Sequence, residues 1–308
     1  MLKKMLKKMP KTYAFCQHML RRKKIKIINK RKKLTWEQKI ALVEKIYYIR
    51  IGHKLDWNNL TTYTEKMQWY KMYDYDIRKS ILSDKLAVRK WIEEKIGKKY
   101  LIPLLGAWSN FDDINFDLLP NQFVLKTNNG SGTNLIVRNK MKLNKKLTRR
   151  LVNDWLDTDF AYYNPFEFQY SKIKPMIIAE KFMGDGLREL PDYKFLCFDG
   201  NPTFCWVDMN RYSNHTRNVY DMNWNLQSWN QCLHSYDEII PKPKCFEEMK
   251  KIASLLSKGF SHVRVDLYVI NDKVYFGEMT FTNGSGFEKI YPDSADVMLG
   301  ELWKIDNK

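Results

Sequence analysis

The chain has 308 residues, 44% of them hydrophobic, and its 53 basic and 35 acidic side chains give a net charge of +18. This length and apolar content predict an ordered globular protein of one large domain or two to three smaller ones. We expect no membrane span and no secretory signal, because no run of 18 apolar residues and no unbroken apolar N-terminal stretch occurs. Five scattered cysteines without a C-x-x-C pair indicate free thiols rather than disulfides or a zinc site, so we expect a cytoplasmic protein.

The positive charge is concentrated at the N-terminus. Residues 1–33 contain 14 Lys or Arg and no Asp or Glu, whereas the rest of the chain contains 39 basic and 35 acidic residues. Before Pro10, apolar residues alternate with lysines at helical spacing, which predicts a short amphipathic segment suited to an anionic membrane surface. A solvated tail is an equally good interpretation. We expect no nucleic-acid partner, because the body shows no second basic patch.

Helix and strand patterns follow one another along the rest of the chain. Thr35 and Gln38 predict a capping box at the start of a helix that reaches at least Tyr47. A second helix is expected between Ser83 and Gly97. The later predicted elements are strands 123–126 and 134–137, helix 143–157, strand 176–182, hairpin 193–198 with 203–207, helix 246–258, and a hairpin of strands 263–268 and 274–278. This mixture predicts an α+β fold with largely antiparallel sheets.

The last hairpin carries two carboxylates, Asp266 and Glu278, on opposite strands. A strict two-residue turn at 271–272 would place them on opposite faces, whereas a three-residue loop or a bulge would place them opposite each other. The apolar pattern favours the second register. That register buries Val265, Leu267, Val269, Tyr275, Met279 and Phe281 and leaves Arg264, Asp266, Glu278 and Thr280 on the other face.

Two facing carboxylates repel each other unless a cation lies between them. Magnesium prefers oxygen ligands and often completes its shell with substrate phosphates, so it is the natural occupant. An exposed strand face with Asp266 paired to a lysine explains the pattern equally well.

A lysine and a glycine loop occur earlier in the chain. Lys126 ends a predicted strand, and Gly130, Ser131 and Gly132 follow in a loop whose backbone N–H groups could approach an anion closely. These residues alone favour a plain hairpin turn. Neither G-x-x-x-x-G-K-[ST] nor G-x-G-x-x-G occurs, which disfavours the nucleotide folds that carry those motifs.

In this order, the segments resemble the ATP-grasp superfamily and, more narrowly, the TupA-like ATP-grasp proteins of bacterial cell-surface polysaccharide gene clusters. The resemblance runs from about residue 55 to 303. The motifs that carry it are 64–69, 83–89, 100–106, 119–126, 190–195 and 284–289. It implies an ATP-grasp fold, in which two α+β subdomains clasp ATP. The expected division is a basic arm (1–33), a helical region (34–118), a lid subdomain (119–183) and a catalytic subdomain (184–308).

The resemblance also implies roles for individual residues. Phosphates would be contacted by Lys85, Lys126 and the loop Gly130, Ser131 and Gly132, and adenine by Glu180, Lys181 and Phe182. Magnesium would be held by Asp266 and Glu278, with Thr280 at a position where the superfamily has an asparagine ligand. Catalysis is assigned to Lys194, Arg211 and Arg264, and acceptor binding to the turn at Asn283, Gly284 and Ser285. Independently of the resemblance, His215 and Arg217 lie in the polar stretch 210–218, which could face an anionic acceptor; a solvated surface loop explains this stretch better.

The implied activity is an ATP- and Mg²⁺-dependent carboxylate–amine ligase that acts through an acyl phosphate. Phosphoryl transfer needs positioning and charge neutralisation more than a covalent residue, and lysines with magnesium provide both. The family context implies an amino acid or amine donor and a saccharide or uronic-acid acceptor of a capsule or O-antigen unit. Such units are built on lipid carriers at the inner face of the cytoplasmic membrane, where the basic arm would fit.

Three other functions stay open. A glycosyltransferase could use one of two D-x-D triplets, at 74–76 and 157–159, to hold a nucleotide-sugar metal. A sugar or lipid-carrier kinase would share the ATP site and differ in using a hydroxyl acceptor. An ATP-binding scaffold without activity is conceivable because of Thr280.

Overall fold

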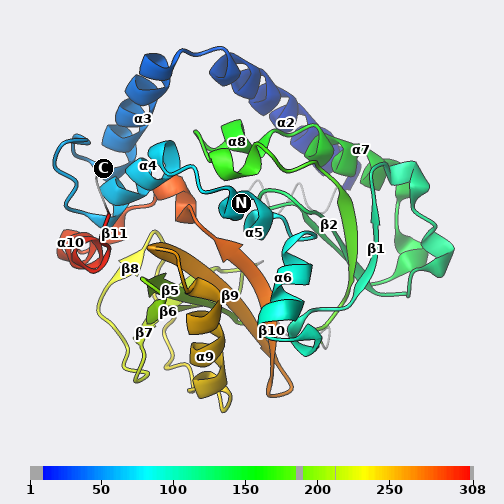
Figure 1. Cartoon of the computed structure of the whole chain (residues 1–308). Coiled ribbons are helices and arrows are strands. Elements are labelled where there is room, and N and C mark those ends of the chain that lie inside the picture. The colour runs from blue at the N-terminus through cyan, green and yellow to red at the C-terminus, as the bar shows by residue number, and fades with distance from the viewer. Residues whose placement is uncertain (1–9, 185–189, 212, 306–308) are drawn as a thin grey trace. The chain divides into compact units, whose positions relative to one another are not determined.

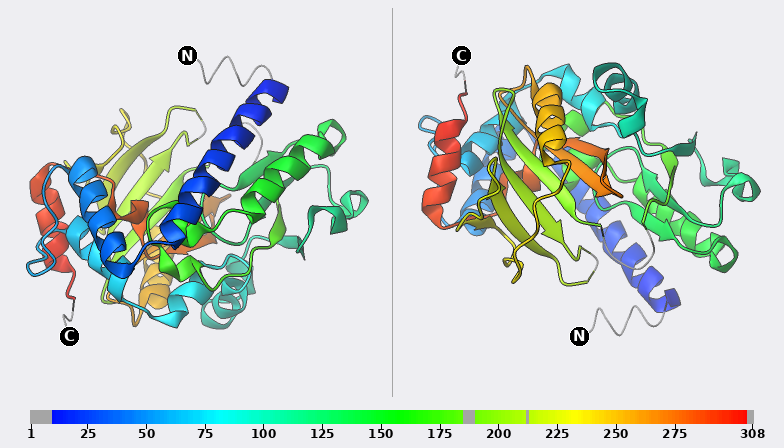
Figure 2. Two further views of the ribbon diagram at one scale, coloured as in Figure 1. Left: turned by 90° about the horizontal axis from the view of Figure 1, so that it is seen from above. Right: turned by 90° about the horizontal axis from the view of Figure 1, so that it is seen from below.

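The computed structural model describes residues 10–184, 190–211 and 213–305, with side chains from residue 19 on. The chain forms two compact units, which are drawn in Figures 1 and 2. Unit 1 comprises the chain up to Lys39, the short segment Asp84–Leu86, and Pro103–Phe182. Unit 2 comprises Ile40–Ser83, Ala87–Ile102 and the chain from Met183 on. The expected division into a basic arm, a helical region, a lid subdomain and a catalytic subdomain stays a prediction.

Unit 1 is built on a four-stranded antiparallel sheet with the strand order β1-β4-β2-β3. Its strands are β1 (Leu104–Trp108), β2 (Phe123–Thr127), β3 (Asn134–Val137) and β4 (Ile177–Lys181). Phe123 and Leu125 are fully buried in the core of this unit, so the residues that alternate with them, Val124 and Lys126, lie on the opposite face. Lys126 therefore lies on the face away from this core, directly opposite Asn134 of β3. The predicted pairing of these two strands is confirmed.

The helices of unit 1 are α2 (Pro10–Lys32), α7 (Lys145–Leu156) and α8 (Phe160–Tyr163), and its 3₁₀ turns are η2 (Phe111–Asp113), η3 (Phe116–Leu118), η4 (Lys140–Lys142) and η5 (Phe168–Tyr170). α2 packs against α7 and α8 (Figure 1). Arg31 Nη1 donates hydrogen bonds to the carbonyls of Tyr162 and Tyr163, at 2.8 and 2.6 Å, and Ile28 is buried. The basic segment is thus a docked helix from residue 10 on. The apolar pattern predicted before Pro10 lies outside the described residues.

Unit 2 contains a five-stranded antiparallel sheet with the order β10-β9-β5-β6-β7. Its strands are β5 (Asp192–Phe198), β6 (Asn201–Met209), β7 (Thr216–Asp221), β9 (His262–Ile270) and β10 (Lys273–Thr280). Helix α9 (Phe246–Ser257) covers one face (Figure 2), where Phe246 stacks on Phe195 at 5.8 Å between ring centroids. Since side chains alternate along a strand, Lys194 and the residues aligned with it lie on the opposite face.

Shorter elements complete unit 2. These are α4 (Tyr63–Tyr73), α5 (Ile77–Ser83), α6 (Val88–Lys95), η1 (Lys98–Tyr100), η6 (Asn283–Gly286), α10 (Asp293–Leu302) and the paired strands β8 (Asn230–Gln231) and β11 (Ile290–Tyr291). α3 (Trp36–Ile51) begins in unit 1 and continues into unit 2. α4 packs against α10, where Asp296 Oδ1 accepts a hydrogen bond from the backbone N–H of Thr64 at 2.9 Å.

The fold class was predicted correctly: helices combine with antiparallel sheets. The helices predicted over 143–157 and 246–258 are α7 and α9, and the predicted hairpin around residues 199–200 joins β5 to β6. At that turn Asp199 and Gly200 both have positive φ, as a tight two-residue hairpin requires. No helix in the described part of the chain combines the length and the apolar character needed to span a bilayer.

Candidate functional site

The loop after β2 has a conformation that only glycine adopts easily at two positions. Gly130 and Gly132 have φ angles of 65° and 70°. A Cβ atom on Gly130 would overlap the ring of Phe160, whereas one on Gly132 would meet nothing within 4 Å. Thr127 closes the loop, because its hydroxyl donates to the Asn129 carbonyl at 3.1 Å and to the Thr133 hydroxyl at 2.9 Å. The loop is therefore a defined structure, and Gly130 is required for both angle and space.

Lys85 reaches this loop from the short segment Asp84–Leu86 of the same unit. Its ammonium donates to the Gly130 carbonyl at 2.6 Å, and its backbone N–H donates to the Asn128 carbonyl at 2.9 Å. The structure thus brings together Lys85 and the glycine loop, which the resemblance had assigned to phosphate binding.

Lys126 and Glu180 lie together on the sheet of unit 1. Lys126 Nζ is 2.6 Å from Glu180 Oε2, and both side chains are largely buried. Lys181 is exposed, and Phe182 lies under the guanidinium of Arg138 at 5.5 Å from its ring centroid. The loop also holds a buried amide, Asn129, whose Oδ1 has no hydrogen-bond partner among the residues described. A cation, a carboxylate and an unsatisfied amide are polar groups that a phosphate-bearing, hydrogen-bonding ligand could engage.

The acidic hairpin places Asp266 opposite Glu278, as predicted. Asn271 and Asp272 form a two-residue turn with positive φ angles, and Lys273 pairs with Ile270. The register then shifts at Gly277, which is a β-bulge. A Cβ atom on Gly277 would lie 2.9 Å from the Asp266 carbonyl oxygen, so the bulge has no room for a side chain.

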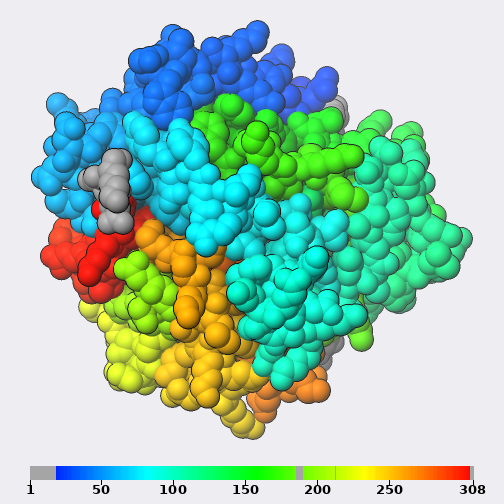
Figure 3. Space-filling model, in the orientation of Figure 1, coloured from blue at the N-terminus to red at the C-terminus, as the bar shows by residue number. Residues whose placement is uncertain are grey.

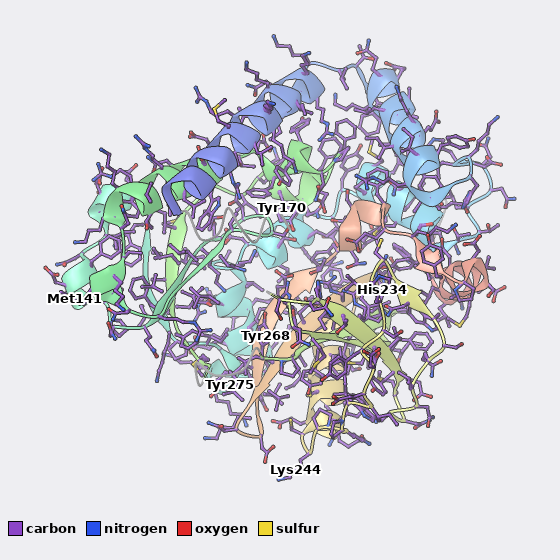
Figure 4. All side chains as sticks on the ribbon, turned by 180° about the vertical axis from the view of Figure 1, so that it is seen from behind. Met141, Tyr170, His234, Lys244, Tyr268 and Tyr275 are labelled. Carbon is purple, nitrogen blue, oxygen red and sulfur yellow. The ribbon has the colours of Figure 1, made fainter. Side chains whose placement is uncertain are left out.

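One prediction for this hairpin was wrong. Tyr275 was expected in the core, but the core residues of β10 are Val274, Phe276 and Met279. The bulge inserts one residue between Phe276 and Glu278, so the inward and outward directions of the side chains exchange at Gly277. The two-residue alternation that correctly places Met279 in the core therefore gives the wrong face for Tyr275. Tyr275 pairs instead with Tyr268, and both are labelled in Figure 4.

Asp266 is almost completely buried, and two cations neutralise it. Arg264 binds it in a bidentate manner, with Nε to Oδ1 and Nη2 to Oδ2 both at 2.7 Å. Lys194 Nζ lies 2.7 Å from Oδ2. Burial raises the pKa of Asp266, and the attraction of the two cations opposes that shift. The ionised form of Asp266 is therefore stable at this buried position only because Arg264 and Lys194 lie beside it.

A third carboxylate in this cluster, Asp192, was not singled out from the sequence. Its Oδ2 lies 2.5 Å from Lys194 Nζ and 2.5 Å from Arg211 Nη1, and its Oδ1 is buried without a partner in the described structure. Asp192 stands two residues before Lys194 on one strand. This spacing, which puts two side chains on the same face, was the signal that could have found it.

Glu278 is the more accessible acid of the hairpin, with a side chain 35% exposed. Arg264 Nη2 lies 3.5 Å from its Oε1, and the Thr280 hydroxyl donates to the same oxygen at 3.3 Å. Together with Asp192 and Asp266, it balances the charges of Lys194, Arg211 and Arg264. The predicted metal and catalytic residues of this unit therefore form one charge-balanced group, which we call the sheet cluster (Arg264, Asp266, Glu278, Thr280, Lys194, Asp192 and Arg211).

The donor set of the sheet cluster suits magnesium. Asp266 and Glu278 are hard oxygen donors that face each other on neighbouring strands. Within the described residues, no group of three or more acidic, histidine or cysteine side chains is arranged to hold a metal ion. Two carboxylates are nevertheless what magnesium commonly takes from a protein when substrate phosphates and water complete its shell.

The loop after β10 contacts the sheet cluster through Asn283. Its Oδ1 accepts a hydrogen bond from Arg264 Nη1, and its Nδ2 donates to Gln231 Oε1 at 2.6 Å. The next residues, Gly284 and Ser285, both have a φ angle of 54°. Lys71 supports this turn, since its ammonium donates to the Ser285 carbonyl at 2.9 Å. Three of the predicted substrate residues thus lie in one turn beside the cluster.

Arg217 lies on β7 of the same sheet and His215 directly precedes that strand, and both contact a different acid, Asp208. Arg217 is buried and binds Asp208 with Nε to Oδ1 at 2.5 Å and Nη2 to Oδ2 at 3.0 Å. His215 Nε2 lies 3.2 Å from Asp208 Oδ2. Although burial opposes the shift, Arg217 and His215 hold the pKa of Asp208 far below its usual range. The charge of Arg217 is therefore compensated within the protein.

Three of the four carboxylates in the two D-x-D triplets have structural partners. Asp74 forms an ion pair with Lys79 at 2.9 Å, and Asp76 forms one with Arg78 at 2.6 Å. Asp159 caps α8 by accepting a hydrogen bond from the Ala161 N–H at 3.0 Å, and it also pairs with Lys32. These partners account for Asp74, Asp76 and Asp159 without a nucleotide-sugar metal.

The model of the family described as TupA-like ATPgrasp matches residues 65–304. No curated protein sequence matches this chain.

Several solved structures are similar in part. They include a D-alanine–D-alanine ligase from Bacillus anthracis (18% identity, 65% of this chain and 57% of that chain covered, TM-score 0.41). A D-alanine–D-alanine ligase from Helicobacter pylori has 15% identity, covering 73% of this chain and 62% of that one, with a TM-score of 0.37. The carboxyaminoimidazole ribonucleotide synthase of Aspergillus clavatus, complexed with ATP, has 10% identity, 65% and 45% coverage, and a TM-score of 0.39. The chain spans less than two thirds of the length of each.

The glycine loop gives a graded prediction. Gly130→Ala should lower the free energy of unfolding by about 2 kcal/mol or more, because it adds a clash with Phe160 to the cost of a left-handed alanine. Gly132→Ala, which meets no atom, should cost about 1 kcal/mol. Urea denaturation of both variants measures the difference, and equal losses would contradict the role given to Phe160.

The bulge gives a second prediction. Gly277→Ala should destabilise the protein by about 1–3 kcal/mol, because the added methyl group meets the Asp266 carbonyl and the Tyr268 ring. Lys273→Ala, at an exposed position of the same strand, is the control and should change stability by less than about 0.5 kcal/mol. Denaturant unfolding of both variants tests this, and a Gly277→Ala protein as stable as the control would show that the bulge tolerates a side chain.

Proposed function

The chain belongs to the TupA-like ATPgrasp family, and from this we propose that it is an ATP- and magnesium-dependent ligase that joins a carboxylate to an amine. The observation that carries the proposal is the sheet cluster of unit 2. It gathers three carboxylates and three cations that are separated by up to 86 positions in the sequence, and four of these side chains, those of Asp192, Lys194, Arg264 and Asp266, are buried. Buried charges of this kind are concentrated at functional sites, because elsewhere they cost stability.

In this proposal the residues have distinct roles. Lys85, Lys126 and the loop at 130–132 bind phosphates, and Glu180, Lys181 and Phe182 hold adenine. Asp266 and Glu278 bind magnesium, and the Thr280 hydroxyl, already bonded to Glu278, orients that carboxylate. When bound, ATP supplies the phosphoryl group that turns a substrate carboxylate into an acyl phosphate.

Other residues of the sheet cluster act by charge. Lys194 and Arg264 lie within 3 Å of Asp266, so they are close enough to stabilise negative charge that develops beside the metal carboxylates. Arg211 is the most exposed cation of the cluster, at 38% of its side chain, which suits it to an anionic substrate. Asn283, Gly284 and Ser285 contact the acceptor. His215 and Arg217, which contact Asp208 rather than Asp266, form another side of the substrate region.

The proposed biological role is the modification of a capsule, O-antigen or other cell-surface polysaccharide. The acceptor is a saccharide or uronic acid, carried on a lipid, and the donor is an amino acid or amine. Support comes from the resemblance of the motifs to proteins of such gene clusters. The structural partners of Asp74, Asp76 and Asp159 favour this ligase over a glycosyltransferase, because each D-x-D triplet has at least one acid that is already paired.

Thermal unfolding with different nucleotides tests the ATP proposal. ATP with magnesium should raise the melting temperature, since a ligand at 100 times its Kd stabilises the folded state by about 2.7 kcal/mol. Neither a UDP-sugar nor ATP with a chelator should match it. Asp266→Asn and Glu278→Gln should remove the part of the shift that depends on magnesium, and Asp272→Asn at the hairpin turn serves as control. Protection by a UDP-sugar alone would favour a transferase.

Analysis of products in cells tests the reaction. Mass spectrometry of the surface polysaccharide should show an amide-linked substituent that is lost on deletion of the protein and in the Asp266→Asn strain. A phosphate on the sugar would instead identify a kinase. An unaltered polysaccharide in the Asp266→Asn strain would favour the inactive ATP-binding scaffold.

We further propose that α2 binds the anionic inner face of the cytoplasmic membrane. Its exposed side chains include Leu20 and Ile27 together with Arg22, Lys23, Lys26 and Lys30, and the helix has no acidic residue. Figure 3 shows the blue atoms of this helix at the surface. Apolar and basic side chains on one exposed face are the combination that binds anionic lipid interfaces.

Vesicle cosedimentation tests the membrane proposal. The full chain should bind vesicles of phosphatidylserine and phosphatidylcholine and not vesicles of phosphatidylcholine alone. Reversal of Lys23, Lys26 and Lys30 to Glu should weaken binding about tenfold or more. The control reverses three exposed lysines of unit 2, Lys90, Lys244 and Lys273. If both triple variants bind equally, α2 is not the contact surface.

A further inference from the structure

The segment Asp84–Leu86 has an unusual place in the chain. It belongs to unit 1, although the residues directly before and after it belong to unit 2. Three residues cannot bury a core of their own, so specific hydrogen bonds must hold this segment to unit 1. Lys85, the lysine proposed to bind phosphate, lies at its centre.

Asn128 provides these hydrogen bonds. Its Nδ2 donates to Asp84 Oδ1 at 3.0 Å, and its backbone carbonyl accepts from the Lys85 N–H at 2.9 Å. Asp84 Oδ1 also accepts from the Leu86 N–H at 2.8 Å, which fixes the turn around Lys85. The backbone of Lys85 is therefore set by one side chain and one carbonyl of Asn128.

Asn128 is also hydrogen-bonded to the segment that leads into β4. Its Oδ1 accepts from the Met176 N–H at 2.7 Å, its Nδ2 donates to the Lys174 carbonyl at 3.1 Å, and its own N–H donates to the Met176 carbonyl at 3.0 Å. Asn128 is 1% exposed. All four polar groups of Asn128, two in its side chain and two in its backbone, are thus paired.

Asn128 also begins the loop that Lys85 contacts. Gly130, whose carbonyl accepts the Lys85 ammonium at 2.6 Å, is only two residues away. A shift of Asn128 would move the backbone of Lys85 and the loop relative to each other. Burial and the number of partners make such a shift costly, because each broken bond leaves a buried polar group.

We propose that Asn128 is a positioning residue that holds Lys85 against the glycine loop, so that both meet the phosphates of ATP in a fixed arrangement. The proposal rests on the proposed ATP binding. Asn128 touches no phosphate in this role and acts through Lys85.

A double-mutant cycle in the full chain tests the proposal. The dissociation constant of ATP with magnesium is measured by calorimetry for the wild type, Asn128→Ala, Lys85→Met and the double variant. We expect each single variant to bind about tenfold or more weakly, and the double variant to bind no more weakly than Lys85→Met. Losses that multiply, or wild-type affinity in Asn128→Ala, would overturn the proposal.

Two matched variants separate positioning from general damage. Asn121→Ala removes another hydrogen-bonding asparagine of unit 1, which accepts from the Lys140 N–H, and it should bind ATP as the wild type does. Asp84→Ala removes the hydrogen bond between Asn128 and Asp84 by changing Asp84, which is only half-buried. This variant should weaken ATP binding as Asn128→Ala does. If Asn128→Ala does not fold, Asp84→Ala decides the question by the same criteria.

A second readout does not depend on ATP. The rate of acetylation of Lys85 by acetic anhydride, followed by mass spectrometry, should rise several-fold in Asn128→Ala relative to Lys90, whose side chain is 88% exposed. An unchanged rate would overturn the proposal. A wild-type protein that shows the protected lysine but binds no ATP would refute the proposed function and leave the positioning role intact.

Discussion

The pairing of buried charge is the constraint on which unit 2 depends. Asp266 lies in an almost water-free position, where an unpaired carboxylate would be too costly to remain ionised. Arg264 and Lys194 neutralise it, and Asp192 in turn balances Lys194. Replacing such a network by apolar residues often stabilises a protein, so its presence on a core sheet is better explained by function than by stability.

Local backbone geometry determines which groups meet in both units. In unit 2 a single extra residue at Gly277 turns Glu278 toward Asp266, and without it the two acids would lie on opposite faces. In unit 1 the positive φ angle of Gly130 directs its carbonyl to the ammonium of Lys85. Both positions are glycines, and a side chain at either one would clash with neighbouring atoms. The placement of these polar groups therefore depends on the absence of a side chain at Gly130 and Gly277.

Apolar periodicity and turn residues act over a few positions, so several elements were predicted correctly from the sequence, among them α7, α9 and the hairpin of β5 and β6. No prediction was made for α4, α10, β1 or β7. The sequence also indicated the Asp266–Glu278 pairing, since one face of that hairpin had to be buried. It could not show how the pairing arises: Tyr275 and Phe276 are both apolar enough for the core, and only the bulge decides between them. Asn128 was missed for a related reason, because its side-chain partners Asp84 and Met176 lie far away in the chain. Asp192 could have been found from its two-residue spacing to Lys194, whereas its pairing with Arg211 follows no local pattern.

The docking of α2 has a practical consequence for deletion experiments. Arg31 satisfies two carbonyls at the end of α8, and Phe160 of that short helix packs against Gly130. A truncated protein that lacks the basic segment would therefore lose support beneath the loop as well as its surface charge. A loss of activity after such a truncation would have two explanations, one at the proposed lipid-binding surface and one at the proposed phosphate-binding loop.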